Sequence, residues 1–130
     1  MKKKLITFLS YLIIAFNTFV SAEEKKDSDI LKIGALLPLS GELKNLGEEM
    51  LYSINLALHD IGDQNIKIYP KNSGSKKEMI IKSCEEFRKE GINIIIGPTD
   101  SEYFDIIENF QDLTFISLSN MNTENKKNII

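Results

Sequence analysis

The sequence predicts an α/β fold in which a parallel sheet carries helices on both faces. Two observations predict it. Apolar runs of strand length, such as Ile30–Leu37, alternate along the chain with segments whose apolar residues recur at helical spacing. Runs that are apolar throughout are typical of strands buried on both faces of a parallel sheet. Strands that alternate with helices favour right-handed crossover connections, so we expect three strand–helix units followed by a fourth strand.

The first strand is expected at Ile30–Leu37, and Pro38 with Gly41 ends it. The first helix follows, with Asn45 as a plausible N-cap and Gly62-Asp63 closing the segment. Its apolar positions fit one helix face. They are Leu46, Met50, Ile54, Ala57, Leu58 and Ile61. The second strand is expected at Ile66–Tyr69, where Pro70 weakens the far end.

The second half of the chain repeats the alternation. Ser75 and Glu78 fit a capping box at the start of a second helix, which Gly91 ends. A third strand follows at Ile92–Ile96, and either Asp100 or Ser101 can cap a third helix. That helix carries Tyr103 or Phe104, then Ile107 and Phe110, and the fourth strand is expected at Leu113–Leu118.

Composition narrows the class of protein. The 130 residues correspond to one small domain, and 42% hydrophobic with 27% charged residues is typical of a folded chain. The net charge of −3 argues against nucleic acid as the main partner, because phosphate binding needs a basic face. A single Cys excludes a disulfide framework and a multi-Cys zinc site.

The first 22 residues have the layout of a secretory signal peptide. Three lysines at positions 2–4 precede an apolar run, Leu5–Phe19, and the small residues Val20-Ser21-Ala22 follow. We expect cleavage after Ala22 and a solvated linker over residues 23–29. An uncleaved membrane anchor is the alternative, although the run is shorter than the roughly 20 apolar residues that span a bilayer.

Signatures of catalysis are missing from the sequence. Neither a dinucleotide-binding nor a phosphate-binding glycine motif is present, and there is no nucleophile elbow. The only His, His59, is expected to point to solvent beside Asp60. Cys84 lies on the apolar stripe of the second helix, which favours core packing over an intermolecular or redox role. We therefore expect no enzyme activity, no catalytic residue, no cofactor and no metal.

The loops after the four strands are rich in hydroxyl and amide side chains. They span residues 38–41, 72–74, 97–101 and 119–122. Ligands of open parallel sheets bind beyond the carboxyl ends of the strands, so these loops could form a rim of neutral hydrogen-bond partners, with helix N-termini aimed at an anion such as a carboxylate. The same residue types are also favoured for turns and N-caps. Both interpretations stay open at this point.

Residues Ile33–Gly41, which read Ile-Gly-Ala-Leu-Leu-Pro-Leu-Ser-Gly, and then Gly47 with an apolar helix resemble the start of the type I periplasmic binding proteins of branched-chain amino acid ABC transporters. The ordered strands and helices agree from Leu31 to about Asn122. The resemblance implies two Rossmann-like lobes with the ligand between them. It makes residues 30–122 a partial first lobe and residues 123–130 a polar tail, so we expect this sequence to be a fragment of a longer protein.

The family resemblance also implies a ligand site, in loops that hold the carboxylate and ammonium of an amino acid. The candidate ligand-binding residues are Ser40, Thr99, Asp100, Ser101, Ser119 and Asn120. Three positions depart from the family pattern. Leu46 stands where an aromatic residue often precedes the glycine, Asn72 where an Asp is common, and Met121 where a Thr is frequent.

The implied function is periplasmic solute binding for an ABC importer, with an amino-acid-like ligand and a transporter permease as partners. The alternative is a regulator similar to the penicillin-binding protein activators, which act by protein contact with cell-wall synthases. The strings Leu-Leu-Pro-Leu-Ser-Gly and Ile-Gly-Pro resemble that branch more closely, whereas the chain lacks the Cys of a lipoprotein near its expected cleavage site.

Overall fold

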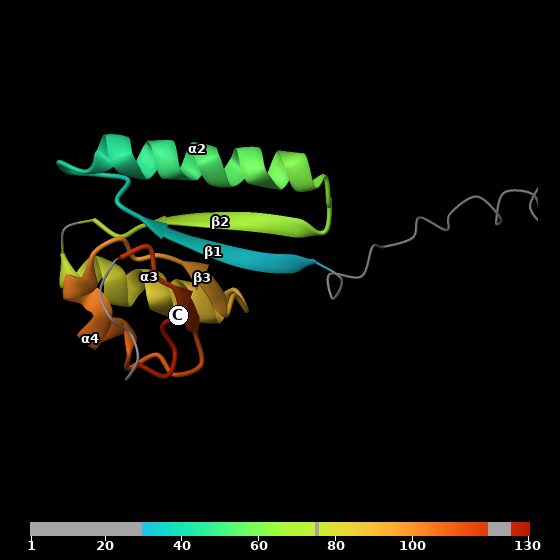
Figure 1. The fold of residues 1–130 in the computed structure, drawn as a ribbon. Coiled ribbons are helices and arrows are strands. Elements are labelled where there is room, and N and C mark those ends of the chain that lie inside the picture. Colours follow the sequence, from blue (N-terminus) through green and yellow to red (C-terminus); the bar gives the residue numbers. More distant parts are fainter. Residues whose placement is uncertain (1–29, 75, 120–125) are drawn as a thin grey trace, which may run out of the picture.

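The computed structural model describes residues 30–74, 76–119 and 126–130, and it confirms the predicted fold class (Figure 1). The sheet has four strands in the order β2-β1-β3-β4, and every pairing is parallel. The strands are β1 (Leu31–Leu37), β2 (Ile66–Asn72), β3 (Ile94–Ile96) and β4 (Thr114–Ile116). The expected signal peptide and linker lie outside the described residues.

Helices lie on both sides of this sheet. Helix α2 (Lys44–Ile61) lies on one side of β1 and β2, and α3 (Lys77–Lys89) and α4 (Phe104–Ile107) lie on the other (Figure 1). A short 3-10 helix, η2 (Ser101–Tyr103), leads directly into α4. Within the described parts of the chain, no helix has both the length and the apolar character needed to cross a bilayer.

The hydrophobic core lies between the sheet and the α3–α4 layer. Its fully buried side chains come from the centre of the sheet and from α3, and they include Leu36, Cys84, Phe87, Ile95 and Phe115. Burial raises the pKa of the Cys84 thiol to about 12, so the thiol stays protonated. This placement confirms the prediction that Cys84 packs in the core.

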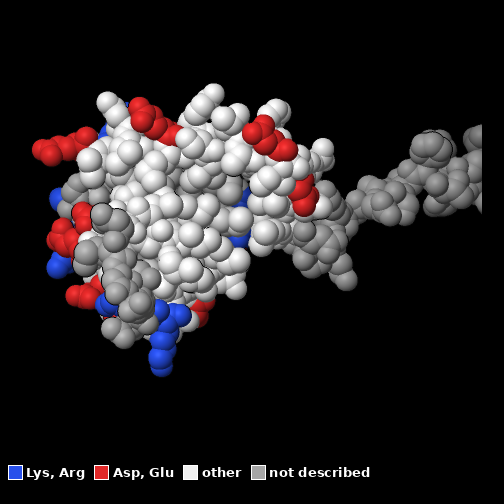
Figure 2. All heavy atoms as spheres, viewed as in Figure 1, with Lys and Arg blue, Asp and Glu red and all other residues white. Residues whose placement is uncertain are grey.

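The opposite face of the sheet is less covered. Helix α2 is confirmed, but Gly47 is its one buried residue, and Leu46 and Ile61 are 44% and 64% exposed. The apolar positions that we assigned to one helix face are therefore not buried as a set, and Ile61, which we expected on the core side, is exposed. Below α2, the surface that faces the viewer in Figure 2 is largely uncharged.

Several element boundaries differ from the prediction. Strands β3 and β4 are shorter than the expected Ile92–Ile96 and Leu113–Leu118, and α4 ends before Phe110. The boundaries of β2 and α2 also differ. Strand β2 continues through Pro70 to Asn72 because it lies at one edge of the described sheet. The Ser73 amide points toward β1 and donates to the Leu37 carbonyl. Backbone amides alternate in direction along a strand, so the nitrogen of Pro70, three residues earlier, faces the open edge. A missing N–H at that edge breaks no strand pairing. Helix α2 begins two residues earlier than expected, with Leu43 instead of Asn45 at its N-cap.

Of the N-caps predicted for the later helices, the one at Asp100 is observed. Asp100 caps η2, because its side chain accepts a hydrogen bond from the Glu102 amide. The N-cap of α3 is Lys76, which makes no side-chain cap bond, and Ser75 lies outside the described residues.

The outer edge of β4 is paired with residues that the sequence analysis assigned to a polar tail. The Phe115 amide donates to the Asn128 carbonyl, and the Ile130 amide donates to the Phe115 carbonyl, both at 2.8 Å. The Asn128 side chain is buried and donates to the carbonyls of Ile107 and Phe110. Residues 126–130 therefore extend the sheet beside β4, although their sequence shows no strand periodicity.

Gly47 fixes the distance between α2 and the end of β1. A Cβ atom at this position would lie 2.2 Å from the Pro38 carbonyl oxygen, which belongs to the backbone and cannot move aside cheaply. We predict that Gly47→Ala lowers the free energy of unfolding by about 2–3 kcal/mol, measured by urea unfolding. Ser53→Ala, at an exposed position of the same helix, is the control and should change it by less than about 0.5 kcal/mol. Equal stability of the two variants would contradict the close approach.

Candidate functional site

A hollow of about 200 Å³ lies beyond the carboxyl ends of β1, β2 and β3. The chain passes from β1 to β2 on one side and then to β3 on the other, so this is the point where the strand order reverses. Open α/β sheets bind ligands in the crevice at such a point. The lining residues are Pro38, Leu43, Ser73, Gly74, Pro98, Thr99, Asp100, Glu102 and Tyr103. We call this the switch-point hollow.

Gly97 lets the loop after β3 approach β1. Its φ is +105°, a conformation that side chains disfavour, and a Cβ there would lie 2.3 Å from the Leu36 carbonyl oxygen. The loop can therefore leave β3 in contact with the backbone of β1. This approach brings Pro98, Thr99 and Asp100 to the hollow.

Asn72 joins the loops after β1 and β2. Its Oδ1 accepts hydrogen bonds from the amides of Leu39 and Gly74, both at 2.9 Å, and its Nδ2 donates to the Ser40 hydroxyl at 2.7 Å. One half-buried side chain thus fixes both loops at the rim of the hollow. Because Asn72 carries an amide, one side chain supplies both the acceptor and the donor.

The charged groups of the switch-point hollow are both acidic. Asp100 and Glu102 line it, and no Lys or Arg is among the lining residues. Tyr103 is buried, and desolvation, followed by the negative charges of Glu102 and Asp100, raises the pKa of its hydroxyl above the ordinary value. This lining does not suit the anion that the sequence interpretation placed at helix N-termini, and η2 is only three residues long.

Ser73 supplies a buried hydroxyl to the same hollow. The residue is 3% exposed, and its amide donates to the Leu37 carbonyl at 2.7 Å. The hydrogen bonds found among the described residues include none from the Ser73 hydroxyl. Ser73 therefore contributes a polar side chain to the lining of the hollow.

The structure places the predicted site residues in different surroundings. Thr99 and Asp100 line the switch-point hollow together. Ser40 is bound to Asn72, and Ser101 opens η2; neither is among the lining residues. Ser119 follows β4, where its amide donates to the Ser117 hydroxyl at 3.1 Å. Asn120 lies outside the described residues.

Sequence reasoning singled out Thr99 and Asp100 among the lining residues and missed the polar side chains of Ser73, Glu102 and Tyr103. Ser73 belongs to a loop that we did place on the rim, but its turn-forming context gave no reason to single it out. Tyr103 was expected on a helix, as a core residue. Its helical position indicates burial, and the sequence holds no signal that it also borders a cavity.

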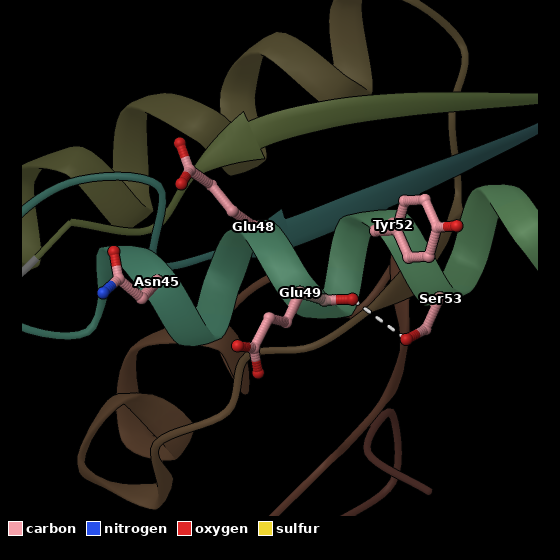
Figure 3. A pocket seen from close by; sticks show the side chains of 5 residues that line it. All are labelled: Asn45, Glu48, Glu49, Tyr52 and Ser53. Atoms are coloured by element: carbon pink, nitrogen blue, oxygen red, sulfur yellow. Dashed lines mark hydrogen bonds between the residues drawn. The ribbon is translucent and has the colours of Figure 1, made fainter.

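A second hollow, of about 590 Å³, lies on the outer face of α2 (Figure 3). All of its lining residues come from that one helix: Asn45, Glu48, Glu49, Tyr52 and Ser53. The Ser53 hydroxyl donates to the Glu49 carbonyl, so it is engaged within the helix. Because no second element of the described chain lines this hollow, we do not treat it as the site. Among the described residues, no three His, Cys, Asp or Glu side chains gather where they could hold a metal ion.

Comparison with solved structures identifies the fold. A leucine-binding protein, LivK, from Thermotoga maritima MSB8 matches with a TM-score of 0.66 and 19% identity, over 77% of this chain and 31% of that one. The described chain has the fold of the first lobe of type I periplasmic binding proteins. A solute-binding protein of an ABC transporter from Rhodopseudomonas palustris BisB5, in complex with 3,4-dihydroxybenzoic acid, matches with a TM-score of 0.67 and 17% identity. That match covers 78% of this chain and 31% of that one.

A more distant match is full-length LpoA from Haemophilus influenzae, with a TM-score of 0.56 and 23% identity over 68% of this chain and 16% of that one. The chain therefore spans a third or less of the length of these structures. No protein-family model matches the sequence, and no curated protein matches it either. At these identities the likeness establishes the fold.

The bonds of Asn72 give a testable stability difference. Asn72→Ala removes three hydrogen bonds of a half-buried side chain, and we expect a loss of about 2 kcal/mol of unfolding free energy. Asn72→Asp keeps the acceptor for both amides, and the Ser40 hydroxyl can turn to donate, so its loss should stay below about 1 kcal/mol at pH 7. Urea unfolding of the three proteins measures both values. An Ala variant as stable as the parent would show that Asn72 does not join the loops.

Proposed function

We propose that this chain is part of an extracytoplasmic solute-binding protein of an ABC importer, and that the switch-point hollow holds one end of a small, amino-acid-like solute. The observation that carries the proposal is the position of the hollow. It lies beyond the carboxyl ends of three parallel strands, at the reversal of strand order, where open α/β sheets bind ligands.

The size and the lining of the hollow support a binding role. A volume of about 200 Å³ is below the 300–1,000 Å³ of complete small-molecule pockets, as expected if one lobe supplies only half of a cleft. The lining combines apolar walls, such as Pro38, Leu43 and Pro98, with hydroxyl and carboxylate groups that can orient a ligand. These groups include no nucleophile paired with a base, so we propose binding without catalysis.

Solved structures of the same fold support the class of function. One is described as a leucine-binding protein and another as the solute-binding protein of an ABC transporter. We extend solute capture and a transporter permease partner to this chain. The expected signal peptide over residues 1–22 and the periplasmic location form part of the same proposal.

A second candidate is a regulator that acts by protein contact with cell-wall synthases. The observation that favours it is the apolar hollow of about 350 Å³ between α2 and the ends of β3 and β4, lined by Leu46, Met50, Ile54, Ile96 and Leu118. Exposed apolar surface of this kind often marks a contact with another protein.

Thermal unfolding with a panel of solutes separates the two candidates. A ligand that binds only the native state raises the midpoint of unfolding, and at 100 times its Kd it stabilises by about 2.7 kcal/mol. We expect at least one amino acid or small amide to raise the midpoint in a concentration-dependent way. The midpoint of Thr99→Tyr, which fills the hollow, should not respond to the same solute. No response to any solute, together with binding of a purified cell-wall synthase, would replace solute capture by the second candidate.

A further inference from the structure

Helix α3 carries one polar residue, Ser83, on its buried face. The other buried residues of this helix belong to the hydrophobic core: Ile80, Cys84 and Phe87. A serine inside a helix often returns its hydroxyl to a carbonyl of the preceding turn, as Ser53 does in α2, where it donates to the Glu49 carbonyl at 2.9 Å. The Ser83 hydroxyl instead reaches out of its helix and donates to the Asn72 carbonyl of β2, at 3.2 Å.

The Asn72 carbonyl faces the outer edge of β2. The Ser73 amide, which belongs to the same peptide unit, points toward β1 and donates to the Leu37 carbonyl at 2.7 Å. In a trans peptide unit the N–H and the C=O point in opposite directions, so the carbonyl points away from β1. Strand β2 is at the edge of the described sheet, and no strand of the described chain pairs with that side. Ser83 therefore supplies the hydrogen bond that a neighbouring strand would otherwise make.

A second contact holds the same end of β2 to α3. The Lys71 Nζ lies 3.0 Å from a Glu86 carboxylate oxygen and 2.8 Å from a Glu90 carboxylate oxygen. It also lies over the Phe87 ring, 5.4 Å from the ring centre. Two successive residues of β2 are thus bound to α3, Lys71 through its side chain and Asn72 through its carbonyl.

We propose that Ser83 is a positioning residue for solute binding, which acts through Asn72 on the rim of the switch-point hollow. This inference rests on the proposed solute-binding function. The Asn72 side chain accepts the Leu39 and Gly74 amides, both at 2.9 Å, and Gly74 lines the hollow. A shift of the Asn72 backbone would weaken both bonds together, because they end on one side-chain oxygen. Ser83 is not among the lining residues, so its effect on a solute passes through Asn72.

The alternative is that Ser83 only fills space beneath α3. An alanine would occupy nearly the same volume, and its cost would then appear as a change in the free energy of unfolding of the whole protein. A positioning role predicts a different result, in which the loss is concentrated at the two loops that Asn72 joins. Local measurements at these loops therefore separate the two roles.

Amide hydrogen exchange of the 15N-labelled full chain, followed by NMR without any solute, tests the link between Ser83 and the loops. We expect Ser83→Ala to speed the exchange of the Leu39 and Gly74 amides about fivefold, because one hydrogen bond that holds Asn72 is lost. The Thr114 amide of β4 should change by less than about twofold. Ser53→Ala is the matched control, since it also removes a helix hydroxyl that donates to a carbonyl, and it should change none of these rates.

A double-mutant cycle tests whether Ser83 acts through Asn72. In Asn72→Ala the side chain that holds the loops is gone, so the further change Ser83→Ala should not speed the Leu39 amide again. The same cycle is measured by calorimetry with leucine and with butyramide. Ser83→Ala should weaken binding of the tighter solute about threefold to tenfold in the parent, and less than about twofold in Asn72→Ala.

The outcomes separate this inference from the proposed function. Equal acceleration of the Leu39, Gly74 and Thr114 amides, or no acceleration of any of them, would overturn the inference. A solute that binds Ser83→Ala as tightly as the parent would overturn it as well, while solute capture would stand. If neither leucine, butyramide nor any other solute of the panel binds the parent, the proposed function and the binding role of Ser83 both fall.

Discussion

Close backbone contact around the carboxyl end of β1 is the constraint on which the rest of the structure depends. Gly47 of α2 lies against the Pro38 carbonyl, and Gly97 after β3 lies against the Leu36 carbonyl. A side chain at either position would overlap a backbone atom that has little freedom to move. Two elements from different parts of the chain therefore meet at the end of one strand. The switch-point hollow is the space that remains between their loops.

This arrangement separates the scaffold from the chemistry. The parallel sheet, the α3–α4 core and the two glycine contacts position three loops, whereas a few side chains on those loops determine what the hollow can bind. Asn72 fixes two loops to each other, and Asp100 caps η2 with one carboxylate oxygen while it faces the hollow. A site built in this way can change its ligand through loop residues without a change of fold, which is consistent with the different ligands named for structures of this fold.

The fold could be predicted from the sequence because its signals are local. Apolar runs and helical spacing identify each strand and helix, and Asp100 is recognisable as a cap from its residue type. The outcome at α2 was not predictable, because its apolar stripe has the same period whether or not anything covers it, and Leu46 is largely exposed. The pairing of residues 126–130 with β4 depends on contacts distant in sequence. The same holds for Ser73, whose burial arises where three loops converge.

The central claim is that the switch-point hollow, and not another surface, binds the solute. A structure of the full chain determined with a solute that raises its unfolding midpoint tests this most directly. The account predicts ligand density beyond the ends of β1, β2 and β3, in contact with Ser73, Thr99 and Asp100. Ligand density on the outer face of α2 instead, with the switch-point hollow holding only water, would contradict it.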